Sequence, residues 1–186
     1  MTSPGRFSEK IAIVTGGGAG IGAGIALRLL REGATVAVID LDTSPFASQL
    51  SSGAREKLLA VDGDCTDLAT LESFHSRVTE ELGPIDILVN NVGQSGRERA
   101  SEFYRSQSDV WRFVVDVTLF STLLASRQVV PSMREAGRGR IVNVASNAGL
   151  AGEVGISEYA AAKMGVIGFT RSLARELAPF RVNVNA

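Results

Sequence analysis

The chain has 186 residues, a net charge of −1, 45% hydrophobic residues and 21% charged residues, an ordinary composition for one globular domain with a hydrophobic core. Acidic and basic residues are interspersed, which argues against a nucleic-acid-binding face or an anionic membrane partner. The single cysteine, Cys65, excludes an internal disulfide. Because no signal-peptide pattern is present either, we expect a cytoplasmic protein.

Five short apolar segments are predicted to be strands, at 11–15, 35–40, 58–64, 86–91 and 140–146. Each is continuously apolar rather than alternating, which is typical of strands buried on both faces of a parallel sheet.

Helical patterns lie between these segments. The first, at 20–33, ends at a capping glycine, and the second, at 66–83, begins after Thr66 as its expected N-cap. Two longer helices are predicted at 107–134 and 157–178. The apolar stretch inside the first of them carries three charged residues and is not predicted to span a membrane. Strands alternating with helices predict an α/β fold, a doubly wound parallel sheet with helices on both faces, in one domain over residues 1–186.

Every predicted strand ends in polar residues, and ligands bind at the carboxyl ends of strands in open α/β sheets. One polar residue at a strand end is ordinary, but five such ends on one rim predict a site. The residues concerned are Thr15, Asp40, Asp64, Asn90 with Asn91, and Ser146.

The segment "TGGGAGIG" at 15–22 follows a strand and leads into a helix. A tight glycine turn with close backbone approach, at a helix N-terminus with unpaired N–H groups, is suited to a pyrophosphate; the alternative is a purely structural turn. The residues predicted to hold a nucleotide here are Gly16, Gly18, Ala19, Gly20, Ile21 and Gly22.

Asp40 lies eighteen residues beyond Gly22, where a carboxylate accepts hydrogen bonds from the adenosine ribose and repels a 2′-phosphate. Ala19 offers no positive charge to such a phosphate. Both features favour NAD over NADP. Asp42 is a second candidate for this role, and the alternative is that Asp40 only caps a strand or turn.

Tyr159 and Lys163 are four residues apart, so they share one face of a predicted helix, although tyrosine and lysine are both scarce in this chain. A free phenol, with a pKa near ~10, is a poor base at neutral pH, and a neighbouring ammonium favours its ionised form. Ser146 is then placed to hydrogen-bond a reacting carbonyl or alcohol oxygen. The alternative is an incidental pair on a surface helix.

Together, "TGGGAGIG", "NNVG" at 90–93, Ser146 and "YAAAK" at 159–163 resemble the short-chain dehydrogenase/reductase family. The resemblance implies a Rossmann fold and NAD(P)-dependent interconversion of alcohol and carbonyl, with Lys163 also binding the nicotinamide ribose. It further implies homodimers or homotetramers that pair through helices 107–134 and 157–178. It places further cofactor contacts at Asp64 and Cys65 by the adenine, at Asn91 near the adenosine ribose, and at Gly93.

Two features depart from the family pattern. Thr118 stands where the family usually has a catalytic asparagine that holds a water near the lysine, so we expect a weaker or rearranged proton relay through Thr118. The chain also stops at "RVNVNA", before the family's substrate-covering segment and last strand. We therefore expect a truncated or longer protein whose sixth strand is an open sheet edge.

Other candidates are assigned structural roles. His75 is expected to be structural or solvated, Cys65 to be a pocket wall rather than a reactive thiol, and Arg97 and Arg99 to be solvated loop charges, with contact to an anionic substrate as the alternative. One histidine and one cysteine give no basis for a metal site.

The predicted function is an NAD-dependent oxidoreductase that interconverts a secondary alcohol and a ketone through Tyr159. The C-terminal half is similar to 3-oxoacyl-carrier-protein reductases, which makes that activity the runner-up. A nucleotide-binding sensor or scaffold without turnover is the alternative from another class. The expected substrate-pocket residues are mixed in polarity, so the substrate is not predicted; they are Gln94, Ser95, Asn147, Glu153 and Val154.

Overall fold

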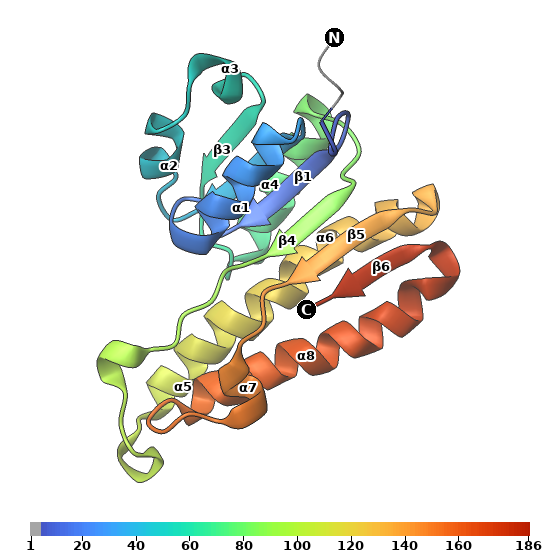
Figure 1. The fold of residues 1–186 in the computed structure, drawn as a ribbon. Coiled ribbons are helices and arrows are strands. Elements are labelled where there is room, and N and C mark those ends of the chain that lie inside the picture. The colour runs from blue at the N-terminus through green and yellow to red at the C-terminus, as the bar shows by residue number, and fades with distance from the viewer. Residues whose placement is uncertain (1–4) are drawn as a thin grey trace.

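The computed structural model describes residues 5–186, and its centre is one sheet of six parallel strands (Figure 1). The chain builds the sheet outward from β1 in one direction and then outward from β4 in the other, so that the connection changes direction between these two strands. The strands are ordered β3-β2-β1-β4-β5-β6, with bounds β1 Ile11–Thr15, β2 Thr35–Asp40, β3 Leu58–Asp62, β4 Ile87–Asn90, β5 Gly139–Asn143 and β6 Val182–Asn185.

Helices cover both faces, which confirms the predicted α/β doubly wound architecture in three layers. On one face, α1 (Gly20–Arg31) packs its Ala26, Leu29 and Leu30 against β1, β2 and β4. On the other, apolar side chains of three helices form the larger core with the sheet. These are α4 (Leu68–Glu81), α6 (Ser121–Ala136) and α8 (Ser157–Leu177).

Shorter elements complete the chain. They include one π-helical turn, η3 (Asp116–Phe120), which interrupts the predicted 107–134 helix between α5 (Ser108–Val115) and α6. The remaining ones are α2 (Ser44–Ser48), α3 (Ser52–Arg55), α7 (Asn147–Ala151) and the 3₁₀ turns η1 (Arg97–Arg99), η2 (Phe103–Arg105) and η4 (Ala178–Phe180).

The expectation that all five strands are buried on both faces is wrong for β5. Val142 pairs in register with Val89, which packs under α1, yet Val142 is 41% exposed. Among residues 5–186, α1 covers only the β1–β2–β4 part of this face, so the outer strands β5 and β6 alternate between buried and exposed residues. In the described residues β6 pairs with β5 alone, so it is an edge of this six-stranded sheet, as expected.

Several element boundaries also differ from the prediction. Strands β3, β4 and β5 end one to three residues early, because the polar residues that follow them turn into loops. The N-cap of α4 is Asp67, whose carboxylate accepts a hydrogen bond from Thr70 N at 2.8 Å, and not Thr66. Thr66 instead donates its hydroxyl to Asp64.

The continuous helical segment Ser108–Ala136 is long and apolar enough to cross a membrane, judged by length and composition alone, a test that core helices of soluble proteins also pass. In this structure α6 packs against β4, β5 and α4, and α5 and η3 pack against α8. Residues buried along the segment include Val114, Thr118, Ala125 and Met133. This packing favours a core helix.

Candidate active site

The glycine-rich turn between β1 and α1 requires glycine at two positions. Gly16 adopts φ +65°, a conformation that L side chains rarely take. A Cβ on Gly22 would lie 1.9 Å from the Gly16 carbonyl oxygen. Asn91 then fastens the turn to β4, because its Nδ2 donates to the same carbonyl oxygen at 2.9 Å. The turn is therefore held close to the end of β4.

The N-terminus of α1 has the properties of an anion site. Ala19 is its N-cap, no side chain caps the first turn, and no acidic residue lies in that turn. The free N–H groups and the positive end of the helix dipole therefore point toward any anion seated on the turn. Gly20 and the exposed Ile21 begin the helix beside it.

A cavity of about 490 Å³ lies against this turn at the carboxyl ends of the strands. Seven of the predicted cofactor residues line it. It is also lined by residues that the sequence did not predict as cofactor contacts, namely Leu41, Gly63, Thr66, Val92, Phe113 and Val117. The predicted residues found there are Gly16, Ala19, Asp40, Asp64, Cys65, Asn91 and Gly93. Phe113 and Val117 carried no signal, because their helix is far from the turn in sequence.

Two carboxylates border this cavity in fixed positions. Asp40 Oδ2 accepts from Gly18 N at 2.9 Å and its Oδ1 accepts from Leu41 N at 2.8 Å. Asp64 Oδ1 accepts from both the amide and the hydroxyl of Thr66 at 2.8 Å. Asp42, the second candidate for the ribose, instead bonds Ser44 and is not among the lining residues.

Cys65 forms part of the cavity wall and is buried. Burial, together with the negative charges of Asp40 and Asp64, raises the pKa of its thiol to about 12. Because the thiolate is the reactive form, this cysteine is inert at neutral pH, in agreement with its predicted role as a wall.

Tyr159 and Lys163 lie together on α8, with the lysine Nζ 5.8 Å from the centre of the tyrosine ring. Lys163 is only 3% exposed, and its ammonium donates to the Val144 carbonyl oxygen at 2.5 Å. Burial lowers the pKa of Lys163 to about 8. A Cβ on Gly93 would lie 3.2 Å from this Nζ, so the ammonium lies where the cavity wall meets the tyrosine.

Ser146 is the N-cap of α7, and its Oγ accepts from Ala148 N at 3.2 Å. The hydroxyl proton is left free to donate. Ser146 lines a second cavity of about 620 Å³, together with residues such as Asn147, Leu150 and Thr170. Neither Ser146, Tyr159 nor Lys163 lines the cavity by the glycine-rich turn.

Thr118 is fully buried in η3, and its hydroxyl bonds the backbone of one residue of the cavity wall, Gln94. Its Oγ1 accepts from Gln94 N and donates to Gln94 O, both at 3.2 Å. Gln94 directly follows Gly93, so Thr118 holds the segment that lies against the Lys163 ammonium. Its single hydroxyl proton is donated to Gln94 O.

The polar rim divides into two groups. Asp40, Asp64 and Asn91 face the cavity, whereas Thr15 and Asn90 are buried inside the rim. Asn90 Nδ2 donates to Ser126 Oγ at 2.9 Å and to Asn143 Oδ1 at 2.8 Å, and Asn143 in turn donates to Thr170. These three hydrogen bonds connect β4 and β5 to α6 and α8.

The loop arginines are paired with carboxylates. Arg97 bonds Glu153 at 2.6 Å and Arg99 bonds Asp109 at 2.8 Å, all of them exposed. His75 is half-buried between α4 and α6, and its Nε2 has no partner among residues 5–186. Residues 5–186 contain no group of three or more side chains that could together hold a metal ion.

The turn fits a dinucleotide on the structure's own evidence. Side chains on Gly18 or Gly22 would fill the cradle, since their Cβ atoms would come within 2.2 Å and 1.9 Å of backbone oxygens. The free N-terminus of α1 would donate to the phosphates, and the Asp40 carboxylate on the cavity would accept from the adenosine ribose. The adenosine and the phosphates would be held by the glycine-rich turn together with Asp40, Asp64, Cys65 and Asn91. The nicotinamide side of the cofactor would be held by Gly93 and Lys163.

Comparison with known proteins identifies relatives along almost the whole chain. A family model described as short chain dehydrogenase matches residues 10–186. A 3-oxoacyl-[acyl-carrier-protein] reductase of Vibrio harveyi is 41% identical over 183 residues, covering 97% of this chain and 72% of that protein.

Two solved structures share this fold at a TM-score of 0.90 each. A crystal structure of levodione reductase is 33% identical and covers 97% of this chain and 71% of its own. The structure of an NAD⁺-bound xylitol dehydrogenase is 30% identical and covers 97% and 70%.

Proposed function

Because the chain belongs to the short-chain dehydrogenase family, and is thus related to oxidoreductases of alcohol and carbonyl groups, we propose that it is an NAD-dependent enzyme that interconverts a secondary alcohol and a ketone. The observation that carries the proposal is the buried Lys163 ammonium, which lies 5.8 Å from the centre of the Tyr159 ring and next to Gly93 of the cofactor cavity. The Lys163 ammonium therefore lies between the Tyr159 side chain and the wall of the cofactor cavity.

Tyr159 moves the proton in this mechanism. In oxidation, its phenolate accepts the hydroxyl proton of the alcohol. A nicotinamide held beside Gly93 and Lys163 would supply the acceptor for the hydride from the same carbon. The phenolate is stabilised by the Lys163 charge, and Ser146 donates its free hydroxyl proton to the reacting oxygen. In reduction, the phenol returns the proton to the new alkoxide.

The choice of NAD is supported by Asp40 and Ala19. The Asp40 carboxylate lies on the cavity and is fixed by Gly18 N, so a 2′-phosphate there would face a negative charge. No basic residue lines this cavity. A solved relative is itself described as NAD⁺-bound.

The experiment combines cofactor binding with turnover. We expect calorimetry to give tighter binding of NAD than of NADP, and Asp40→Asn to reduce this difference. Turnover of a panel of secondary alcohols should be lost in Tyr159→Phe while NAD still binds. Tyr104→Phe is the matched control, because Tyr104 is the chain's other tyrosine and is 74% exposed. Equal losses in both variants would contradict the assignment.

The runner-up is a 3-oxoacyl-carrier-protein reductase, which the 41% identical relative supports. It predicts NADPH-dependent reduction of a 3-oxoacyl thioester in preference to alcohol oxidation. The alternative from another class is a sensor or scaffold. It predicts NAD binding with no turnover, both in this chain and in Thr118→Asn.

We further propose a cytoplasmic homodimer or homotetramer. Three large apolar side chains are exposed on the helices that pair in the family, namely Phe113, Phe120 and Met164. Unpaired apolar surface of this kind is typical of protein interfaces.

A further inference from the structure

A second concave site lies at the opposite end of the sheet from the cofactor cavity, where the strands begin. It is a cavity of about 310 Å³. Four of its five charged residues come from the starts of three neighbouring strands. Lys10 precedes β1, Asp86 precedes β4, and Arg138 and Arg140 lie at the start of β5. The lining consists of Arg6, Phe7, Lys10, Asp86, Ile87, Arg138, Gly139 and Arg140. We call it the basic cavity.

Charge in the basic cavity is strongly unbalanced. Four of its eight lining residues are cationic and one is anionic, which gives a formal charge of +3 in a chain whose net charge is −1. Arg6 forms an ion pair with Glu32, which lies outside the lining. Arg140 pairs with no carboxylate among residues 5–186, and its Nη1 donates to the Gly139 carbonyl oxygen.

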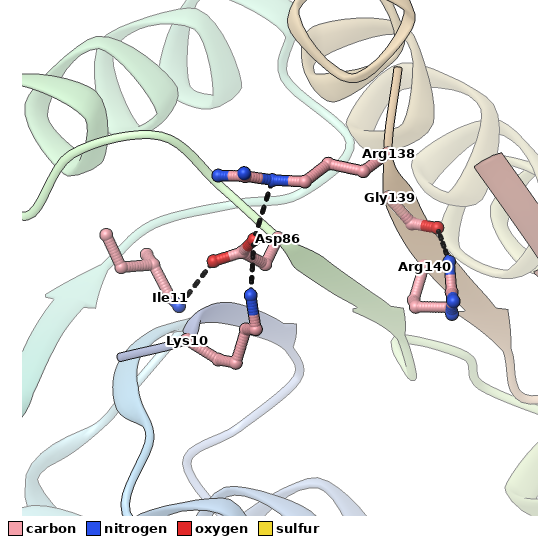
Figure 2. Close-up of polar contacts among 6 residues, drawn as sticks. All are labelled: Lys10, Ile11, Asp86, Arg138, Gly139 and Arg140. Carbon is pink, nitrogen blue, oxygen red and sulfur yellow. Dashed lines mark hydrogen bonds and ion pairs between the residues drawn. The ribbon is translucent and has the colours of Figure 1, made fainter. Parts of the chain in front are cut away.

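The one carboxylate is shared and fixed. A single oxygen, Asp86 Oδ1, lies 3.3 Å from both Lys10 Nζ and Arg138 Nε, while Oδ2 accepts from Ile11 N at 3.2 Å (Figure 2). Charge-assisted bonds are typically about 2.7–2.9 Å long, so neither cation is closely satisfied. The Asp86 side chain is only 10% exposed.

Donors therefore greatly outnumber acceptors at this cavity. A lysine ammonium has three N–H donors and a guanidinium has five. Within residues 5–186, most of the donors on Lys10, Arg138 and Arg140 have no acceptor. Guanidinium groups bind carboxylate and phosphate oxygens in pairs, and they lose little hydration on doing so. An anion with at least two charges would use the donors that Asp86 leaves free.

We propose that the basic cavity binds a small, multiply charged oxyanion, a phosphate ester or a polycarboxylate, on Lys10, Arg138 and Arg140. Asp86 positions the first two of these cations from behind and limits the affinity through its own negative charge. The site is separate from the cofactor cavity, and the proposal does not depend on the proposed reaction.

The test is a titration of the ¹⁵N-labelled chain at constant ionic strength with inorganic pyrophosphate and, separately, with citrate. We expect saturable shifts of the Ile11, Asp86 and Gly139 amide signals. The double variant Arg138→Gln/Arg140→Gln should weaken binding about tenfold or more, while the exposed Arg175→Gln on α8 should leave it unchanged. Tighter binding of pyrophosphate or of citrate tells a phosphate ester from a polycarboxylate.

A second variant gives a change of opposite sign. Asp86→Asn keeps an acceptor for Ile11 N and removes the competing charge, so the anion should bind more tightly. If this variant does not fold, the binding measured for Arg138→Gln/Arg140→Gln tests the proposal alone. Shifts that do not saturate with either probe, shifts confined to Gly18 and Ala19 at the glycine-rich turn, or equal weakening by Arg175→Gln would overturn the proposal.

Discussion

Replacing Thr118 by valine tests whether this residue positions the cavity wall or carries protons. Valine has nearly the same shape but lacks the hydroxyl that bonds both Gln94 N and Gln94 O at 3.2 Å. The backbone N–H and the carbonyl oxygen of Gln94 would then both lose their hydrogen bonds to η3. Its neighbour Gly93 lies against Lys163, so the wall beside the ammonium loses its support.

The size of the effect follows from the two hydrogen bonds. An unsatisfied buried polar group costs about 1–3 kcal/mol. Gln94 is exposed, so water replaces part of what is lost. We therefore expect a cost of about 1–2 kcal/mol in binding, which is a factor of about 5–30 in the Kd for NAD or in KM, with a smaller change in kcat.

The assay measures NAD affinity by calorimetry and kcat and KM at pH values below and above the Lys163 pKa of about 8. Thr118→Ser keeps the hydroxyl and should restore binding. Thr122→Val is the matched control, because the buried Thr122 hydroxyl bonds the Thr118 carbonyl oxygen one turn along the same helix and touches no cavity residue.

One result would refute this reasoning. If Thr118→Val left NAD affinity and KM unchanged but lowered kcat and shifted the pH profile, the hydroxyl would belong to the proton path. Thr118 would then take part in the proton relay, which the sequence predicts to be weaker or rearranged in this chain.

Four further predictions follow from the geometry. Lys163→Met should abolish turnover yet raise the free energy of unfolding at pH 7 by about 1–3 kcal/mol. Burial lowers the pKa of Lys163 from 10.5 to about 8, so the folded state binds fewer protons than the unfolded state between these pH values. Urea titrations should therefore show the stability gain of the variant fading from about pH 8 to pH 10.5. Gly22→Ala should weaken NAD binding and destabilise the fold by about 1–3 kcal/mol, because its Cβ meets the Gly16 carbonyl oxygen, whereas Gly24→Ala, with nothing within 4 Å, should stabilise it by about 0.5–1 kcal/mol in thermal melts. Burial lowers the pKa of His75 below 6.5, so its neutral form favours folding above pH 6.5 and this contribution is lost as the pH falls; His75→Gln should show a flatter loss of stability on acidification. Phe120→Arg should lower the mass measured by light scattering if α5, η3 and α6 pair between subunits, and an unchanged mass would place the interface elsewhere.

Local sequence signals predicted most of the scaffold. Strands β1 and β2 begin and end where their apolar runs do, and the long helices follow from apolar residues three and four apart. The π turn at Asp116–Phe120 had no such signal, because a one-residue bulge in a helix is set by what packs around it. Here it places Thr118 against Gln94.

The same limit applies to the faces of the sheet. A continuous apolar run indicates that a strand suits burial on both sides, but not that a helix is present to cover each side. Arg140 and Val142 lie on the side of β5 where none of the described helices packs, and both are exposed. Burial on the second face depends on other segments of chain, which the strand's own residues do not reveal.

In the polar rim, the sequence shows which residue types are present but not the direction in which each side chain points. Asn90 and Asn91 are adjacent and chemically identical, and at the end of a strand successive side chains point in opposite directions. Asn91 therefore reaches the glycine turn and the cavity, while Asn90 reaches Ser126 and Asn143 in the core. Because the two directions are fixed by which face receives α6, a pair of asparagines predicts a polar rim without predicting which of them a ligand can touch.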